Sequence, residues 1–283
     1  MRLGELPVGA LVKEQQSGTL FYVAAQNHPG YQGTTLITRH IIAARAFDAR
    51  EPSNPEKTTF RNPGKYGNNE YALSNIHQWL NSEEEDWYHP SHPYDAPPDE
   101  AGTWYGEQPY HRKPGFLARF SPEFRAGILE VQVPYTVRTG VDSSECRTVQ
   151  AKAFLPSRTE INFGDEWGIP EGVPFPLFEQ DPYLTYAVPS PDQVERHGRD
   201  WNPPSEYAGY DDPGIFHPKL GWKYWLRSAC SKYSFVARYF HPVFQLSYDK
   251  VCIDVTGVRP VLNLDPEMSC CEEQTEQGTV WRV

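Results

Sequence analysis

The sequence lacks long apolar runs. No segment approaches the roughly 18 consecutive apolar residues that a membrane-spanning helix requires, so we expect no membrane insertion. The residues that follow Met1, from Arg2 to Pro7, contain no apolar core of a signal peptide, which predicts synthesis in the cytoplasm. A chain of this kind that acts outside the cell would leave it by lysis or by assembly into a virion.

Clusters of basic residues are missing as well. The chain has 283 residues and a formal net charge of −11 at pH 7, and it contains no run of Lys and Arg. Binding to the phosphate backbone of nucleic acid requires such clusters. We therefore do not expect nucleic acid as a partner.

The cysteines form no framework. They are five in number, are irregularly spaced and include no CxxC pair, so neither zinc nor disulfides are indicated. We interpret them as unpaired thiols. They are Cys146, Cys230, Cys252, Cys270 and Cys271.

Motifs for catalysis are absent too. We find no nucleophile elbow, phosphate-cradling glycine loop, HExxH or dinucleotide fingerprint, which predicts no enzyme and no cofactor. His89 and His92 could ligate a metal, but no third ligand is specified. The acidic segment 164–172 (GDEWGIPEG) lacks the ligand order of an EF-hand. We therefore predict no metal site.

Aromatic residues, in contrast, are abundant. They make up 14% of the chain, which favours an α+β or all-β core or an aromatic recognition surface. No linker or internal repeat divides the sequence. We predict a single α+β domain over residues 1–283, with loop insertions near 83–115 and 164–218.

Local patterns predict the elements of this domain. Ser74 is placed to cap a helix that ends near Asn81, with Ile76, Trp79 and Leu80 on its buried face and His77 in solvent. Ser121-Pro122-Glu123 begins a second helix, whose buried side is marked by Phe124 and Ile128. Ser157–Glu160 and Ser190–Gln193 have capping-box spacing. Strands are predicted at Val8–Lys13 and Leu20–Ala25 (a hairpin through Gln16–Gly18), Thr34–Ile42, Val131–Val137, Ala151–Leu155, Trp222–Arg227, Val258–Leu264 and Thr279–Val283.

Several motifs in combination carry a family resemblance. YWLRSA (Tyr224–Ala229) and, some thirty residues on, GVRPVLNL (Gly257–Leu264) resemble the signature of a domain family of unknown function from gut bacteria and their phages. YALSNIHQWLN (71–81), GFLARFSPEFRAGIL (115–129) and KAFLPSRTEI (152–161) are similar to further segments of that family, in the same order. The resemblance implies a C-type-lectin-like fold, as in formylglycine-generating and sulfatase-modifying domains. In that fold the chain ends pair in one sheet, two helices flank it and a loop-rich half presents the binding surface.

A second resemblance concerns residues 228–256, which we call the cassette. The cassette is similar to the variable segment of proteins diversified by retroelements, in which AAC codons become NNC. The resemblance implies a phage- or prophage-encoded protein that recognises a bacterial surface receptor, protein or glycan, as a monomer or a homo-oligomer. The residues that we predict to bind ligand are Cys230, Lys232, Tyr233, Phe235, Val236, Tyr239, His241, Phe244, Ser247, Tyr248, Asp249, Lys250, Cys252 and Ile253. Asp254 also belongs to the NNC set, whereas Lys232 and Lys250 do not and would need another template codon or a fixed site.

Many simultaneous substitutions are tolerable only where side chains point outward from a backbone that other residues hold. We therefore expect the cassette side chains to face solvent. We expect Trp225, Arg227, Gly257 and Arg259 to act as scaffold, with both arginines buried in ion pairs or bonded to backbone carbonyls. Two alternatives stay open: a formylglycine-generating type of enzyme that uses Cys230 and Cys252, and a carbohydrate-binding lectin.

Overall fold

The alternating segments near the N-terminus form the predicted hairpin. In the computed structural model, which describes residues 1–138, 144–190, 222–242, 244–275 and 278–283, β1 (Leu11–Lys13) pairs antiparallel with β2 (Leu20–Gln26). β1 begins three residues later than predicted because Gly9 has a positive φ of 88°, which ends any extended run. Val12, Phe21 and Val23 of this hairpin are fully buried.

The described residues form a mixed α+β fold that consists mostly of strands, with a few short helices. The remaining strands are β3 (Thr34–Thr38), β4 (Ala43–Ala44), β5 (Ile128–Leu129), β6 (Val131–Arg138), β7 (Ser144–Ala151), β8 (Ala153–Phe154), β9 (Tyr224–Ala229), β10 (Val236–His241), β11 (Gln245–Lys250), β12 (Gly257–Val258), β13 (Val261–Leu264), β14 (Cys271–Thr275) and β15 (Gly278–Arg282). The α-helices are α1 (Pro63–Tyr66), α2 (Asn75–Leu80), α3 (Pro122–Ala126) and α4 (Pro176–Gln180), and the 3₁₀ turns are η1 (Leu3–Glu5), η2 (Tyr71–Leu73), η3 (Phe116–Arg119) and η4 (Pro182–Thr185).

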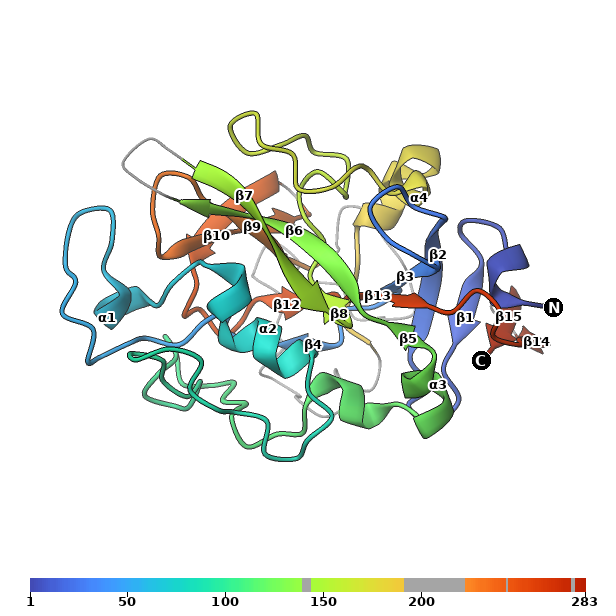
Figure 1. Cartoon of the computed structure of the whole chain (residues 1–283), viewed down its shortest axis with the longest axis horizontal. Coiled ribbons are helices and arrows are strands. Elements are labelled where there is room, and N and C mark those ends of the chain that lie inside the picture. The colour runs from blue at the N-terminus through green and yellow to red at the C-terminus, as the bar shows by residue number, and fades with distance from the viewer. Residues whose placement is uncertain (139–143, 191–221, 243, 276–277) are drawn as a thin grey trace, which may run out of the picture.

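Three sheets organise these strands. The largest has the order β14-β15-β1-β2-β3-β13-β5, with β8 also paired to β13; the second is β11-β10-β9-β12-β4; and β6 pairs with β7. β1 runs parallel to β15, so the two ends of the chain share one sheet. Figure 1 shows both termini at one end of the molecule and α1 at the other.

One predicted strand is shorter than expected and another divides between sheets. The run Thr34–Ile42 supplies only β3 to the large sheet, and the chain then enters the second sheet as β4. The run Val258–Leu264 divides into β12 and β13, with Pro260 between them. Proline lacks the N–H that a continuous ladder needs, which gives a physical reason for the break.

The two predicted helices form, and both caps are confirmed. The Ser74 hydroxyl accepts a hydrogen bond from the His77 N–H, and the Ser121 hydroxyl accepts one from the Phe124 N–H. Ile128 lies in β5 and not in the second helix, which ends at Ala126. His77 is less accessible than predicted: it is half-buried, its ring packs edge-on against Tyr71, and burial lowers its pKa to about 4.

The loops and turns follow the sequence in part. No helix or strand lies between α2 and η3, so the 83–115 insertion is irregular as predicted. It is nonetheless anchored, because Trp87 is buried and stacks on Tyr110 at 5.3 Å. Within 164–190 the structure contains α4 and η4, which were not predicted. Residues 191–218 of that insertion lie outside the described ranges, and so does most of the Ser190–Gln193 capping signal.

Sequence analysis missed two strands because their side chains are mostly polar and exposed. β7 is mostly exposed and polar, and it pairs along its whole length with β6. β14 is of the same kind and pairs with β15. Only Ala151 and β8 represent the strand predicted at Ala151–Leu155.

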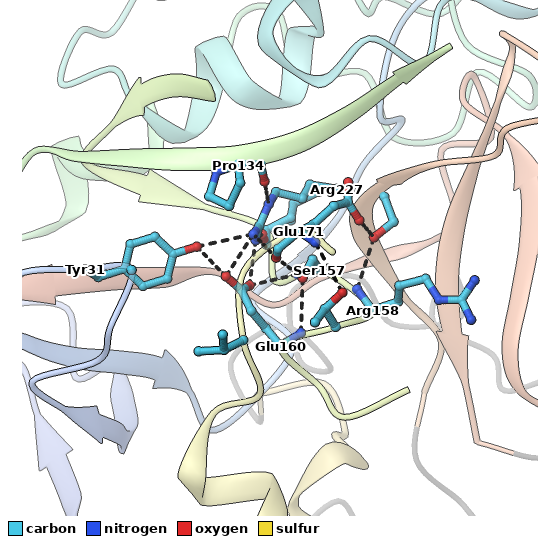
Figure 2. A network of polar contacts seen from close by, with 12 residues as sticks. Tyr31, Pro134, Ser157, Arg158, Glu160, Glu171 and Arg227 are labelled. Carbon is cyan, nitrogen blue, oxygen red and sulfur yellow. Dashed lines mark hydrogen bonds and ion pairs between the residues drawn. The ribbon is translucent and has the colours of Figure 1, made fainter. Parts of the chain in front are cut away.

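A buried ion pair joins the elements around β9, as predicted for Arg227. The Arg227 guanidinium, which is fully buried, donates to both carboxylate oxygens of Glu160 at 2.6 and 2.8 Å. It also donates to the carbonyls of Pro134 in β6, Leu155 after β8 and Glu171. Figure 2 shows these contacts converging on the one side chain. The Glu160 end is set by the predicted capping box, in which Ser157 and Glu160 exchange hydrogen bonds of 2.9 and 3.1 Å.

Arg259 is also buried, and its guanidinium is likewise bonded to backbone carbonyls. Its guanidinium donates to the carbonyls of Thr38, Leu184 and Thr185 at 2.9 to 3.0 Å. It therefore ties the β12–β13 crossover to β3 and η4. Trp225 and Gly257, the other two predicted scaffold residues, are also buried.

Removing the Arg227 charge should strongly destabilise the fold. Arg227→Met leaves the buried Glu160 carboxylate without its partner, which costs about 3–5 kcal/mol of unfolding free energy. The matched control is Arg282→Met, because Arg282 makes an exposed ion pair with Glu273 and should cost about 1 kcal/mol or less. Urea unfolding midpoints measure both, and equal losses would contradict the central role of Arg227.

Candidate functional site

The cassette lies at the end of the molecule away from the termini. It starts in β9, forms the antiparallel β10–β11 hairpin and returns toward β12. Figure 1 shows β10 on the side of the molecule where α1 lies. The described part of the cassette omits only residue 243.

Five predicted ligand residues of the cassette are buried. Cys230, Val236, Cys252 and Ile253 each expose 4% or less of their area, and His241 exposes 8%. The expectation that the whole set faces outward was therefore wrong. For Cys252 and Ile253 the reason is that the chain after β11 runs beneath neighbouring segments, where the Val251 and Cys252 carbonyls accept hydrogen bonds from the N–H groups of Phe47 and Trp104.

Burial also changes the chemistry of these thiols. The pKa of Cys252 is raised to about 11, chiefly by desolvation, so the neutral thiol prevails at neutral pH. Nucleophilic chemistry requires the thiolate. Cys230 is buried as well.

A second group of cassette residues contributes to a row of five aromatic rings. Going along it, the ring centroids of Phe60 and Tyr233 lie 6.1 Å apart, those of Tyr233 and Phe235 5.4 Å, those of Phe235 and Tyr66 4.8 Å, and those of Tyr66 and Trp104 5.9 Å. Every ring is partly accessible to solvent. We call this set the aromatic row.

Five cations accompany the aromatic row. Lys232 and Lys250 come from the cassette, and they lie 5.3 Å from the Tyr233 ring and 4.8 Å from the Trp104 ring. The others come from outside it: Arg138 lies over Phe60, Lys65 over Tyr66 and Arg50 over Trp104, at 5.1 to 5.4 Å. The row is therefore a mixed aromatic and basic surface on an acidic protein.

The third group of cassette residues lies on the hairpin. Tyr239 pairs with Ser247 on one face, and Ala237 pairs with Asp249 beside them. His241 stacks on Phe244 at 4.7 Å near the tip. Phe244 and Tyr248 are 68% and 52% exposed, which is unusual for aromatic side chains of this size.

The two faces of the hairpin are not equivalent. Tyr248 lies on the opposite face from Tyr239, against the Arg238 guanidinium at 5.3 Å. Arg238 in turn donates two hydrogen bonds to the buried Glu166 carboxylate, which Arg158 also contacts at 2.6 Å. The acidic 164–172 segment thus uses its Glu166 to fix the hairpin.

Residues outside the cassette hold the backbone that carries Lys232 to Phe235. The buried Asn69 side chain donates to the carbonyls of Tyr233 and Val236, each at 2.8 Å, and its backbone N–H donates to Ser234 O at 2.7 Å. The Ser234 N–H in turn donates to Phe60 O at 3.0 Å. The backbone conformation therefore does not depend on the Tyr233 or Phe235 side chains.

Conversely, a buried cassette residue holds the backbone of a loop outside the cassette, the loop that presents Trp104. The fully buried Asp254 carboxylate accepts hydrogen bonds from the N–H groups of Tyr105, Glu107 and Gln108 and from the Thr103 hydroxyl, at 2.8 to 3.2 Å. One carboxylate with four donors fixes this loop. Asp254 is therefore a scaffold residue despite belonging to the NNC set.

Sequence reasoning missed the part of the row that lies outside the cassette. Phe60 and Tyr66 lie in the Pro- and Asn-rich chain between β4 and α2, and Trp104 lies in the irregular 83–115 insertion, where no periodicity marks them. The available signal was large aromatic residues in segments rich in Pro, Gly and Asn.

The other sequence candidates lie apart. His89 is 3.6 Å from Glu84 and His92 is 3.7 Å from Glu51, and no group of three or more potential metal ligands occurs in the described residues. A groove of about 640 Å³ follows α2 and includes His77 and His89 but no cassette residue. No helix in the described ranges has the length and apolar character that a bilayer span requires.

Comparison with known proteins gives one match. A family model described as a domain of unknown function (DUF6273) matches residues 32–266, which is most of the chain and includes the whole cassette. No curated protein and no solved structure matches.

Asn69 should matter more to stability than the side chains it positions. Asn69→Ala removes the donors to buried carbonyls and should cost about 1–3 kcal/mol of unfolding free energy. Tyr233→Ser changes a partly exposed side chain on a backbone held by others and should stay within about 1 kcal/mol. Chemical denaturation compares the two variants, and the reverse order of losses would refute this account of the cassette.

Stability should depend on the Glu166 charge. Burial by itself would raise the pKa of Glu166, but hydrogen bonds and charge from Arg238 and Arg158 outweigh it and lower the pKa below its usual value. Because the lowered pKa belongs to the folded state, this stabilisation is present above about pH 4.5 and is lost as the pH falls further. Glu166→Gln should therefore destabilise the protein at pH 7, with a difference from wild type that shrinks below about pH 4.5. Unfolding curves across this pH range test it, and Glu145→Gln, at an exposed pair with Arg147, is the control.

Proposed function

Because the chain belongs to the DUF6273 family of domains of unknown function, we propose its function from its own geometry: it is a ligand-binding protein that uses the accessible cassette side chains for recognition. The observation that carries this proposal is the separation of roles around Asn69. Residues outside the cassette fix its backbone, while Lys232, Tyr233, Phe235 and Lys250 contribute only side chains to the aromatic row.

The chemistry of the exposed residues supports a binding role. Aromatic side chains supply much contact area at a small cost in conformational entropy, and Tyr, Trp and Arg dominate the energetics of protein interfaces. The aromatic row and the exposed Phe244 and Tyr248 provide such anchors within one segment of the chain and its immediate neighbours.

The retroelement proposal follows from the same arrangement. The accessible predicted ligand residues, other than the two lysines, belong to the NNC set, and residues outside the cassette hold the backbone that carries Tyr233 and Phe235. We propose that the protein is phage- or prophage-encoded, is displayed on a virion and binds a receptor on a bacterial surface. Diversification would then act on the row and the hairpin and spare the buried members.

We also propose that the fold is C-type-lectin-like. Three features support this: β1 pairs with β15 at the chain ends, two short capped helices accompany the sheets, and an irregular half carries the cassette. The enzyme alternative would need a reactive thiol, and the raised pKa of Cys252 gives it no support.

A pair of matched libraries tests the separation of roles on which the proposed function rests. One places NNC codons at Tyr233, Phe235, Phe244 and Tyr248, and the other places them at Cys230, Val236, Cys252 and Ile253. We expect most members of the first library to stay folded, since surface substitutions usually change stability by about 0.5 kcal/mol or less. Most members of the second should unfold, because deleting or polarising core side chains costs about 2–5 kcal/mol. Protease resistance of displayed variants measures the folded fraction, and equal tolerance in both libraries would refute the assignment.

Natural variation tests the retroelement separately. Differences between the cassette and a near-copy in the same genome should be confined to template adenines and should concentrate at the accessible positions. Differences scattered over all bases would reject the retroelement. The separation of roles within the cassette would then still be tested by the two libraries.

A further inference from the structure

Four of the five cations of the aromatic row form no ion pair with the described residues. Among the described residues, Arg50, Lys65, Lys232 and Lys250 have no carboxylate within ion-pair distance. Arginines elsewhere on the surface do have one, for example Arg125 with Glu83 and Arg282 with Glu273. Other lysines such as Lys13 also lack an ion-pair partner among the described residues, so what distinguishes the row is that its cations lie together along one set of rings. In a protein of net charge −11, a local group of unpaired cations favours an anionic ligand.

Cations and neighbouring rings cover part of the ring faces of the row. A cation lies over a face of Phe60, Tyr233, Tyr66 and Trp104, and Phe235 lies between Tyr233 and Tyr66. The row therefore offers a ligand ring edges, which carry positive partial charge, and the ammonium groups beside them. Nucleobases need open ring faces on which to stack, so this surface suits them poorly.

We propose that the aromatic row binds a carboxylate-bearing segment of a protein partner. The inference rests on the proposed function and names the ligand class of the same site. Separate lysine ammonium groups act as point charges for individual carboxylates, and the rings between them contact the apolar parts of the segment. Acidic segments bound by clusters of basic residues are a recurring mode of peptide recognition.

The test uses the full chain and a fluorescein-labelled oligoglutamate peptide, followed by fluorescence anisotropy at low and at raised salt. We expect saturable binding that weakens with salt. The triple variant Lys65→Gln, Lys232→Gln, Lys250→Gln should bind about tenfold more weakly, as expected for the loss of three exposed charge pairs. The control triple Lys13→Gln, Lys113→Gln, Lys152→Gln has the same net charge and should bind like the wild type. Unfolding midpoints verify that both triples are folded.

The alternatives give distinct results. Equal weakening in both triples would mean that net charge alone governs binding, and it would overturn the proposal. Tighter binding of alginate would assign the row to an acidic polysaccharide, and tighter binding of oligothymidylate would assign it to single-stranded nucleic acid; either result overturns it. No binding of the peptide also overturns it. None of these outcomes changes the tolerance of the two libraries, so failure of the ligand class is distinguishable from failure of the proposed function.

Discussion

The buried ion pair between Arg227 and Glu160 is the constraint on which the rest of the structure depends. A guanidinium that is fully removed from water must satisfy all its donors, and here it does so with one carboxylate and carbonyls from several segments. Those segments are β6, the chain after β8 and the loop at Glu171, so the guanidinium fixes their positions relative to β9 (Figure 2). Because β9 is held in this way, the cassette that begins in it starts from a rigid strand.

Other buried polar side chains fix the segments that surround β9. Asn69 fixes the backbone before β10, Glu166 fixes the hairpin through Arg238, and Asp254 fixes the loop that carries Trp104. Each is a buried polar side chain whose hydrogen bonds go to backbone groups or to a charged side chain. The aromatic and basic side chains between them carry little of the structural burden. This division separates the stability of the fold from the chemistry of its surface.

Sequence reasoning recovered much of the fold, and some of the residues that it predicted for the site lie together in the aromatic row. The α2 and α3 caps, the opening hairpin and the buried roles of Arg227 and Arg259 follow from local rules, in which a few neighbouring residues suffice. Exposed strands such as β7 were missed because polar residues on both faces give no alternation. The partial burial of His77 was missed because it depends on Tyr71 and not on the helical face. The burial of Cys252 and Ile253 was missed for a similar reason, because it depends on hydrogen bonds from the backbone N–H groups of Phe47 and Trp104, which are distant in sequence.

The sequence by itself determined the α+β class, the short capped helices and the residue types available for recognition. These depend on composition, spacing and local hydrogen bonds, which are present in the linear chain. Only the tertiary structure decided which cassette residues reach the surface and that Phe60, Tyr66 and Trp104 join them. The physical reason is that burial and ring contacts arise between segments far apart in the chain, and their geometry exists only after β9, β10 and the loops have packed together.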